Sequence, residues 1–73
     1  MNPINYNSTI LVLAYCIDEF HGSEPVFGFN LLEESLSKFS NTILVTSDVT
    51  DKKLLEKLEK KYRDKIEIYI VQV

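Results

Sequence analysis

The feature that most constrains the fold is an unbroken apolar run from Ile10 to Ile17, near the start of the chain. The segment Ile10–Tyr15 is rich in strand formers and has no polar residue to mark a solvated face. Strands of this kind are buried on both faces and are typical of parallel sheets. The run therefore predicts a buried parallel strand, which needs a crossover helix to reach its neighbour.

Two helices are expected between three strands, because apolar residues recur at spacings of three and four in two places. The first helix ends at Ser40-Asn41, and the second follows Thr50, its expected N-cap. Apolar, β-branched segments at 42–46 and 66–73 predict the second and third strands. The two apolar stripes consist of Phe29, Leu32, Leu36 and Phe39, and of Leu54, Leu55, Leu58 and Tyr62.

The second helix carries its charges opposite its apolar stripe. Glu56 and Lys60 lie four residues apart, as do Glu59 and Arg63, a spacing that favours ion pairs on an exposed helix. We interpret this charge run as a solvated helix face rather than a binding patch.

The predicted element order is β-α-β-α-β, a single Rossmann-like α/β half-domain over residues 1–73 with a loose lead-in at 1–8. Parallel crossovers are right-handed in about 98% of cases. Two crossovers in one direction therefore place both helices on one face of a three-stranded parallel sheet, with the order 3-2-1. Because the first strand is apolar on both sides, we expect a missing C-terminal domain, a second copy or another protein to cover the bare face. We expect the isolated chain to associate or to fold poorly.

Composition excludes several classes of protein. The chain has 73 residues, a net charge of −3 and no basic face, which argues against nucleic acid and anionic membranes as partners. Cys16 is the single cysteine, so a disulfide-stapled secreted protein is excluded and the thiol is interpreted as buried. No signal-peptide pattern and no apolar segment of about 20 residues is seen. We expect a cytoplasmic protein without metal or cofactor.

The segment from His21 to Asn30 contains both glycines and connects the first strand to the first helix. Such a turn brings free backbone N–H groups and the positive end of a helix to one point, where phosphate groups bind. Gly22 permits a turn with positive φ, and Gly28 leaves room for a ligand near the helix start. The spacing matches neither a dinucleotide fingerprint nor a Walker A loop. The glycine pattern by itself favours a structural turn.

The residues between the glycines add a more specific signal. The strand Ile10–Cys16, the run Gly22-Ser-Glu-Pro-Val-Phe-Gly-Phe-Asn30 and the strand Thr42–Thr46 together resemble the N-terminus of bacterial family-4 glycosyltransferases. The resemblance covers roughly residues 9–73. Val26 stands where that pattern usually has glycine, and Phe29 where it usually has tryptophan.

This resemblance implies a parent enzyme with the GT-B architecture, in which two Rossmann-like domains face each other across a cleft. Such enzymes generally retain anomeric configuration and need no metal; the C-terminal domain holds the nucleotide-sugar substrate and the N-terminal domain mainly binds the acceptor. The resemblance places Gly22, Ser23 and Gly28 nearest the donor phosphates, and Glu24 and Asn30 in ordering the loop or contacting the sugar. The acidic pair of the C-terminal domain has no counterpart here, so we expect no catalytic residue and no transferase activity from this chain alone.

Two other interpretations stay open. The chain is alternatively a small α/β interaction module that dimerises or docks through its bare sheet face, or a stand-alone phosphate- or nucleotide-binding half-domain. Plainer roles are expected for the remaining candidates, which are His21 in an exposed loop, Asp18 and Glu19 at a solvated strand end, Ser47-Asp48 in helix capping, and Tyr62 and Tyr69 at the edge of the core.

Overall fold

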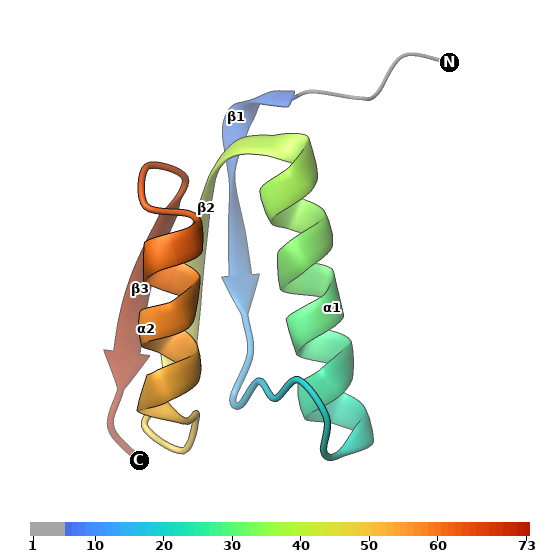
Figure 1. Cartoon of the computed structure of the whole chain (residues 1–73), viewed down its shortest axis with the longest axis vertical. Coiled ribbons are helices and arrows are strands. Elements are labelled where there is room, and N and C mark those ends of the chain that lie inside the picture. The colour runs from blue at the N-terminus through green and yellow to red at the C-terminus, as the bar shows by residue number, and fades with distance from the viewer. Residues whose placement is uncertain (1–5) are drawn as a thin grey trace.

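Three parallel strands and two helices form two layers in the computed structural model, which describes residues 6–73 (Figure 1). The strands are β1 (Tyr6–Leu13), β2 (Phe39–Ser47) and β3 (Ile66–Val71), and the helices are α1 (Ser23–Lys38) and α2 (Lys52–Lys61). β1 pairs with β2 and β2 pairs with β3, both in parallel. The predicted α/β class and the all-parallel sheet are confirmed.

Read from β1, the strand order is β1-β2-β3, which corrects the predicted order 3-2-1. Each crossover contains a single helix and reaches only the adjacent position in the sheet, so each new strand is laid beside the strand before it. β2 is therefore central, and β1 and β3 form the two edges of the sheet.

Several element bounds also differ from the prediction. β1 begins at Tyr6, so the lead-in predicted at 1–8 is too long, and its residues 1–5 lie outside the described part of the chain. α1 begins at Ser23 and includes most of the predicted loop, while Phe39 opens β2 instead of ending the helix. Pro25 is compatible with this early start, because first-turn N–H groups have no acceptor within a helix.

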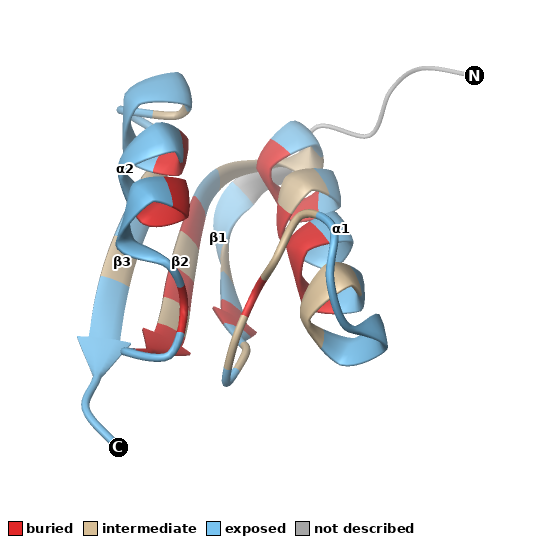
Figure 2. Cartoon of the chain, turned by 60° about the horizontal axis from the view of Figure 1, so that its bottom comes forward, coloured by how far each residue is buried: buried red, intermediate tan, exposed pale blue. Residues whose placement is uncertain are grey.

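The core lies between the helices and one face of the sheet. Burial alternates along β2 because successive strand side chains point to opposite faces. Leu44 is fully buried under the helices, whereas Ile43 and Val45 on the other face are half-buried. Figure 2 shows the buried residues where the helices meet the sheet. The core consists of Val12, Ile17, Phe29, Leu32, Leu36, Leu44, Leu54, Leu55 and Leu58.

The opposite face of the sheet is bare and apolar. Pairing places Leu13 beside Val45 and Val45 beside Tyr69, so these side chains form a continuous row. Leu11, Leu13 and Tyr69 expose 55%, 71% and 55% of their surface. The open face, as we name this surface, consists of the apolar or aromatic residues Leu11, Leu13, Ile43, Val45, Tyr69 and Val71, with Glu67 as a charged residue beside Ile43. The expectation that β1 is buried on both faces is therefore wrong within residues 6–73.

Buried hydroxyl groups fix the segment after β1 to the start of α2. The Ile17 N–H donates to the Thr50 hydroxyl over 3.1 Å, and the Thr46 hydroxyl lies 2.7 Å from the same oxygen. The Tyr15 carbonyl accepts hydrogen bonds from the Thr46 and Ser47 hydroxyls. This network sets the path of the chain as it leaves the sheet.

Thr50 is consequently not the N-cap of α2, which corrects the prediction. Asp51 occupies that position, and its carboxylate accepts a hydrogen bond from the Lys53 N–H over 3.0 Å. Thr50 is instead turned into the core, where it is almost fully buried.

We predict that Thr50→Val destabilises the fold, because it leaves the buried Ile17 N–H without its acceptor. The expected loss is about 1–3 kcal/mol of unfolding free energy, measured by urea denaturation. Thr50→Ser is the matched control, since it keeps the hydroxyl and removes one methyl group worth about 0.8 kcal/mol. Equal stability of the valine and serine variants would contradict a stabilising hydrogen bond between Ile17 and Thr50.

Candidate functional site

The candidate site lies where the chain passes from the end of β1 into α1. Gly22, the N-cap residue, has φ 84° and ψ 135°, a conformation that residues with a side chain rarely adopt. No side chain caps this helix, and the first intrahelical bond runs from the Val26 N–H to the Gly22 carbonyl over 3.2 Å. The N–H groups of Ser23 and Glu24 precede that bond and have no acceptor within the helix.

Asp18 holds the turn that leads into Gly22. Its carboxylate accepts hydrogen bonds from the Phe20 N–H at 2.8 Å and the His21 N–H at 3.0 Å. These backbone donors, Phe20 foremost, lower the pKa of Asp18 below its usual 3.8. The stabilisation is therefore present above the ordinary pKa and is lost as the pH falls through the lower folded pKa. Glu19 pairs with Lys57 at 3.1 Å, so the two neighbouring carboxylates serve different contacts.

Gly28 lies in the second turn of α1 and is buried against the segment after β1. A Cβ at this position meets Ile17 Cγ2 at 3.3 Å and Ala14 Cβ at 3.5 Å. The absence of a side chain therefore lets α1 pack closely on this segment. Its expected place beside a donor phosphate stays a prediction.

A groove of about 420 Å³ lies between the end of β1 and the first turns of α1. Leu13, Tyr15 and Phe27 are among its lining residues and are strongly exposed. Glu24 contributes a carboxylate, and the Cys16 thiol lies 3.8 Å from the Ile17 carbonyl. The full lining of this surface, which we name the β1 groove, is Val12, Leu13, Ala14, Tyr15, Cys16, Glu24, Pro25, Phe27, Gly28 and Leu31.

The β1 groove brings together only part of the predicted site. Glu24 and Gly28 line it, whereas Gly22, Ser23 and Asn30 do not. Ser23 and Asn30 are exposed on α1.

Sequence reasoning missed the apolar side of this groove. Phe27 exposes 70% of its surface and Leu31, one turn later, exposes 43%. The signal was present, because these two apolar residues are four apart and lie off the core stripe of the same helix.

The other candidate residues from the sequence make contacts that stabilise the fold or lie on its surface. The Ser47 hydroxyl accepts from the Val49 N–H over 3.2 Å and so stabilises a turn, and Asp48 is exposed. Tyr62 packs at the edge of the core, as predicted. Tyr69 instead lies on the open face, where its hydroxyl contacts the Glu67 carboxylate at 3.2 Å and its pKa is raised by that carboxylate.

Residues 6–73 show neither a metal-binding cluster nor a membrane-spanning helix. No group of three or more His, Cys, Asp and Glu side chains is placed to hold a metal ion. Within the same residues, neither helix has the length and apolar character needed to cross a membrane.

Comparison with known protein families, with curated proteins and with solved structures found no match to this chain. The likeness to family-4 glycosyltransferases therefore depends on the residues of this chain alone.

We predict that Gly22→Ala destabilises the fold, because alanine is strained at φ 84°. The expected loss of unfolding free energy is about 1–3 kcal/mol in urea denaturation. Ser23→Ala is the matched control; its side chain caps nothing, so its effect stays within about 0.5 kcal/mol. Equal stability of the Gly22→Ala and Ser23→Ala variants would contradict the positive φ of Gly22.

Proposed function

We propose that this chain is the N-terminal, acceptor-side unit of a nucleotide-sugar-dependent glycosyltransferase, catalytically incomplete without a second domain. The observation that carries the proposal is the position of the run from Gly22 to Asn30. It forms the turn and first helical turns that follow a parallel strand at its carboxyl end (Figure 1). That end of the sheet is where α/β folds bind their ligands.

The start of α1 supplies the chemistry that a diphosphate needs. The N–H groups of Ser23 and Glu24 and the positive end of the helix favour an anion. The exposed Ser23 hydroxyl donates a further hydrogen bond to phosphate, and Gly22 places no side chain in the way. Glu24 and Asn30 order the segment or accept hydrogen bonds from sugar hydroxyls. Bond making and breaking belong to the second domain.

The uncovered surfaces favour an incomplete unit. The open face and the β1 groove both expose apolar side chains, including Leu11, Leu13 and Phe27. In a larger doubly wound sheet, further strands and helices cover such surfaces. The partner in this proposal is therefore the missing domain, and the location is the cytoplasm, in keeping with the free thiol of Cys16.

A second candidate function is a protein-interaction module, and the open face favours it. Contiguous exposed apolar patches of this kind mark interaction surfaces in soluble proteins. The DNA that follows the codon for Val73 separates the two candidates. A continuation that encodes a second Rossmann-like domain, in frame or after a frameshift, favours the glycosyltransferase, and an unrelated neighbour favours the module.

Titration of the ¹⁵N-labelled protein with UDP and with inorganic diphosphate tests the phosphate site. We expect amide shifts at Gly22, Ser23 and Glu24 at millimolar ligand, and none with uridine. The start of α2 is an internal control, because the Asp51 carboxylate caps it and repels anions. Absence of shifts at the start of α1, or equal shifts at both helix starts, contradicts the proposal.

A further inference from the structure

β3 ends the sheet with a free edge of unusual composition. The carbonyl oxygens of Lys65 and Val71 accept N–H donors from the β2 side. Because alternate residues of a strand direct their backbone groups to the same side, Ile66, Ile68 and Ile70 present theirs at the free edge. Proteins usually protect such an edge with charges, proline or a short strand. Here, within the described structure, a six-residue strand of mostly β-branched and aromatic residues is left open.

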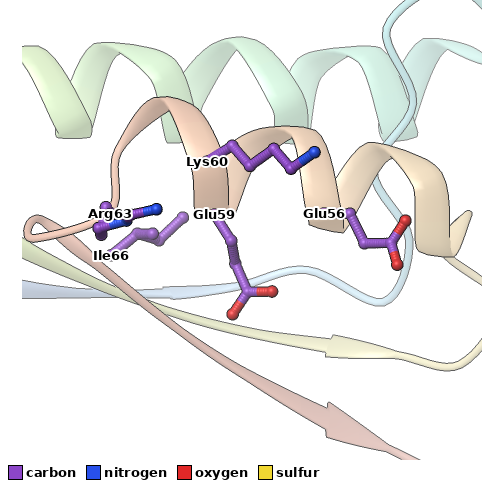
Figure 3. Close-up of a pocket in the computed structure, with 5 residues that line it drawn as sticks. All are labelled: Glu56, Glu59, Lys60, Arg63 and Ile66. Carbon is purple, nitrogen blue, oxygen red and sulfur yellow. The ribbon is translucent and has the colours of Figure 1, made fainter.

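A groove of about 450 Å³ follows this edge between α2 and β3. Figure 3 shows its lining, with Glu56, Glu59, Lys60 and Arg63 on the α2 side and Ile66 on β3. We name this surface the β3 groove. Its charged side chains come from one side of α2 and, for Arg63, from the turn after the helix. The side of α2 toward α1 carries Lys57 and Lys61, which form ion pairs with Glu19 and Glu33.

The charges of the β3 groove have no ion-pair partner among residues 6–73. The pairs predicted between Glu56 and Lys60 and between Glu59 and Arg63 are not formed, which corrects the prediction. All of these residues are exposed, so each charge is available to a partner.

The order of these charges is self-complementary. Along α2 and the turn that follows it, the acidic residues come first and the basic residues Lys60 and Arg63 follow, with Arg63 in the turn. An antiparallel copy of the helix therefore places Glu56 opposite Arg63 of the second copy, and Glu59 opposite Lys60 of the second copy. A two-fold axis relates the copies, as in most homodimers. A parallel arrangement instead places like charges together.

The same two-fold axis also lets the β3 strands of the two copies pair, which joins the two sheets into one. Adjacent strands lie about 4.8 Å apart, and α2 lies over β2 and β3 (Figure 1). If β3 pairs with its copy, the two α2 helices lie on the same side of the sheet and are separated by about two strand spacings. That separation matches the packing distance of helices, about 10 Å at most.

The charge pairs of α2 and the strand pairs of β3 can also share one two-fold axis. α2 rises about 1.5 Å per residue, and β3 advances about 3.3 Å per residue in the opposite direction. Arg63 and Ile66 line the same groove, so counting back from that level places the midpoint between Glu59 and Lys60 near Ile68. Ile68 then pairs with itself across the axis and Ile66 with Ile70 of the second copy. Ile70, which exposes 49% of its surface, becomes covered by the α2 of that copy.

We propose that two copies of this chain associate through β3 and α2, antiparallel about a two-fold axis, into one continuous sheet with the groove charges paired between copies. The proposal is independent of the glycosyltransferase function, because it uses the edge of the sheet opposite the β1 groove. Strand pairing supplies backbone hydrogen bonds, and the charges select the antiparallel register.

Charge reversal tests this interface by sedimentation velocity. Lys60→Glu with Arg63→Glu, and Glu56→Lys with Glu59→Lys, each set like charges against each other. We expect each double variant to raise the dimer Kd at least about 100-fold and an equimolar mixture of the two to restore a dimer. Lys53→Glu with Lys57→Glu is the matched control for the first double variant, because it makes the same charge change on the other side of α2; we expect an unchanged Kd. Circular dichroism verifies the fold of every variant.

Amide hydrogen exchange distinguishes this dimer from one formed through the open face. The Ile66, Ile68 and Ile70 amides are protected in the wild-type dimer and lose that protection in either reversed variant. A monomeric wild type, a dimer that survives both reversals, or a mixture that fails to associate overturns the proposal.

Discussion

Packing on one side of the sheet is the constraint on which the other features of the molecule depend. Leu44 at the centre of β2 is fully buried under side chains of both helices, including Leu32 and Leu36 of α1. No element among residues 6–73 covers the other face, where Leu13 exposes 71% of its surface. Chains of this size gain only about 3–5 kcal/mol from a single core, so covering the second face would contribute a large share of the total stability.

The uncovered surfaces differ in chemistry and therefore suit different partners. The open face is broad and mostly apolar, and the β1 groove combines apolar walls with the Glu24 carboxylate. The β3 groove places two acidic residues, followed by two basic residues, beside a free backbone edge. The glycine-containing segment of the glycosyltransferase resemblance contributes Glu24, Pro25, Phe27 and Gly28 to the lining of the β1 groove. Asp18 and Gly22 fix its turn, and Gly28 lets the following helix pack closely. The segment is thus shaped by the fold before any ligand is present.

The sequence was sufficient where burial follows a period. The stripe of Leu54, Leu55 and Leu58 and the segments at 42–46 and 66–73 identified α2, β2 and β3, because buried side chains recur at helical or strand spacing. Sequence reasoning failed where tertiary contacts determine the bounds of an element or the role of a side chain. The early start of α1 at Ser23 is hidden because its first turns are largely exposed, and the role of Thr50 depends on a hydrogen bond to Ile17, 33 residues away. The expected pairs of Glu56 and Glu59 with basic residues four positions later do not form, because spacing alone does not fix side-chain direction.

Methyl relaxation in the presence of a soluble paramagnetic agent tests the central claim, that the open face is a surface to be covered. Leu11 and Leu13 point away from the helices, whereas Val12, between them on β1, is buried and serves as the internal reference. We predict that the methyl groups of Leu11 and Leu13 relax almost as slowly as those of Val12 in the folded protein, because association through the open face, separate from the contact between β3 strands, shields them. Strong relaxation enhancement at Leu11 and Leu13 in a well-folded, monodisperse protein would contradict it.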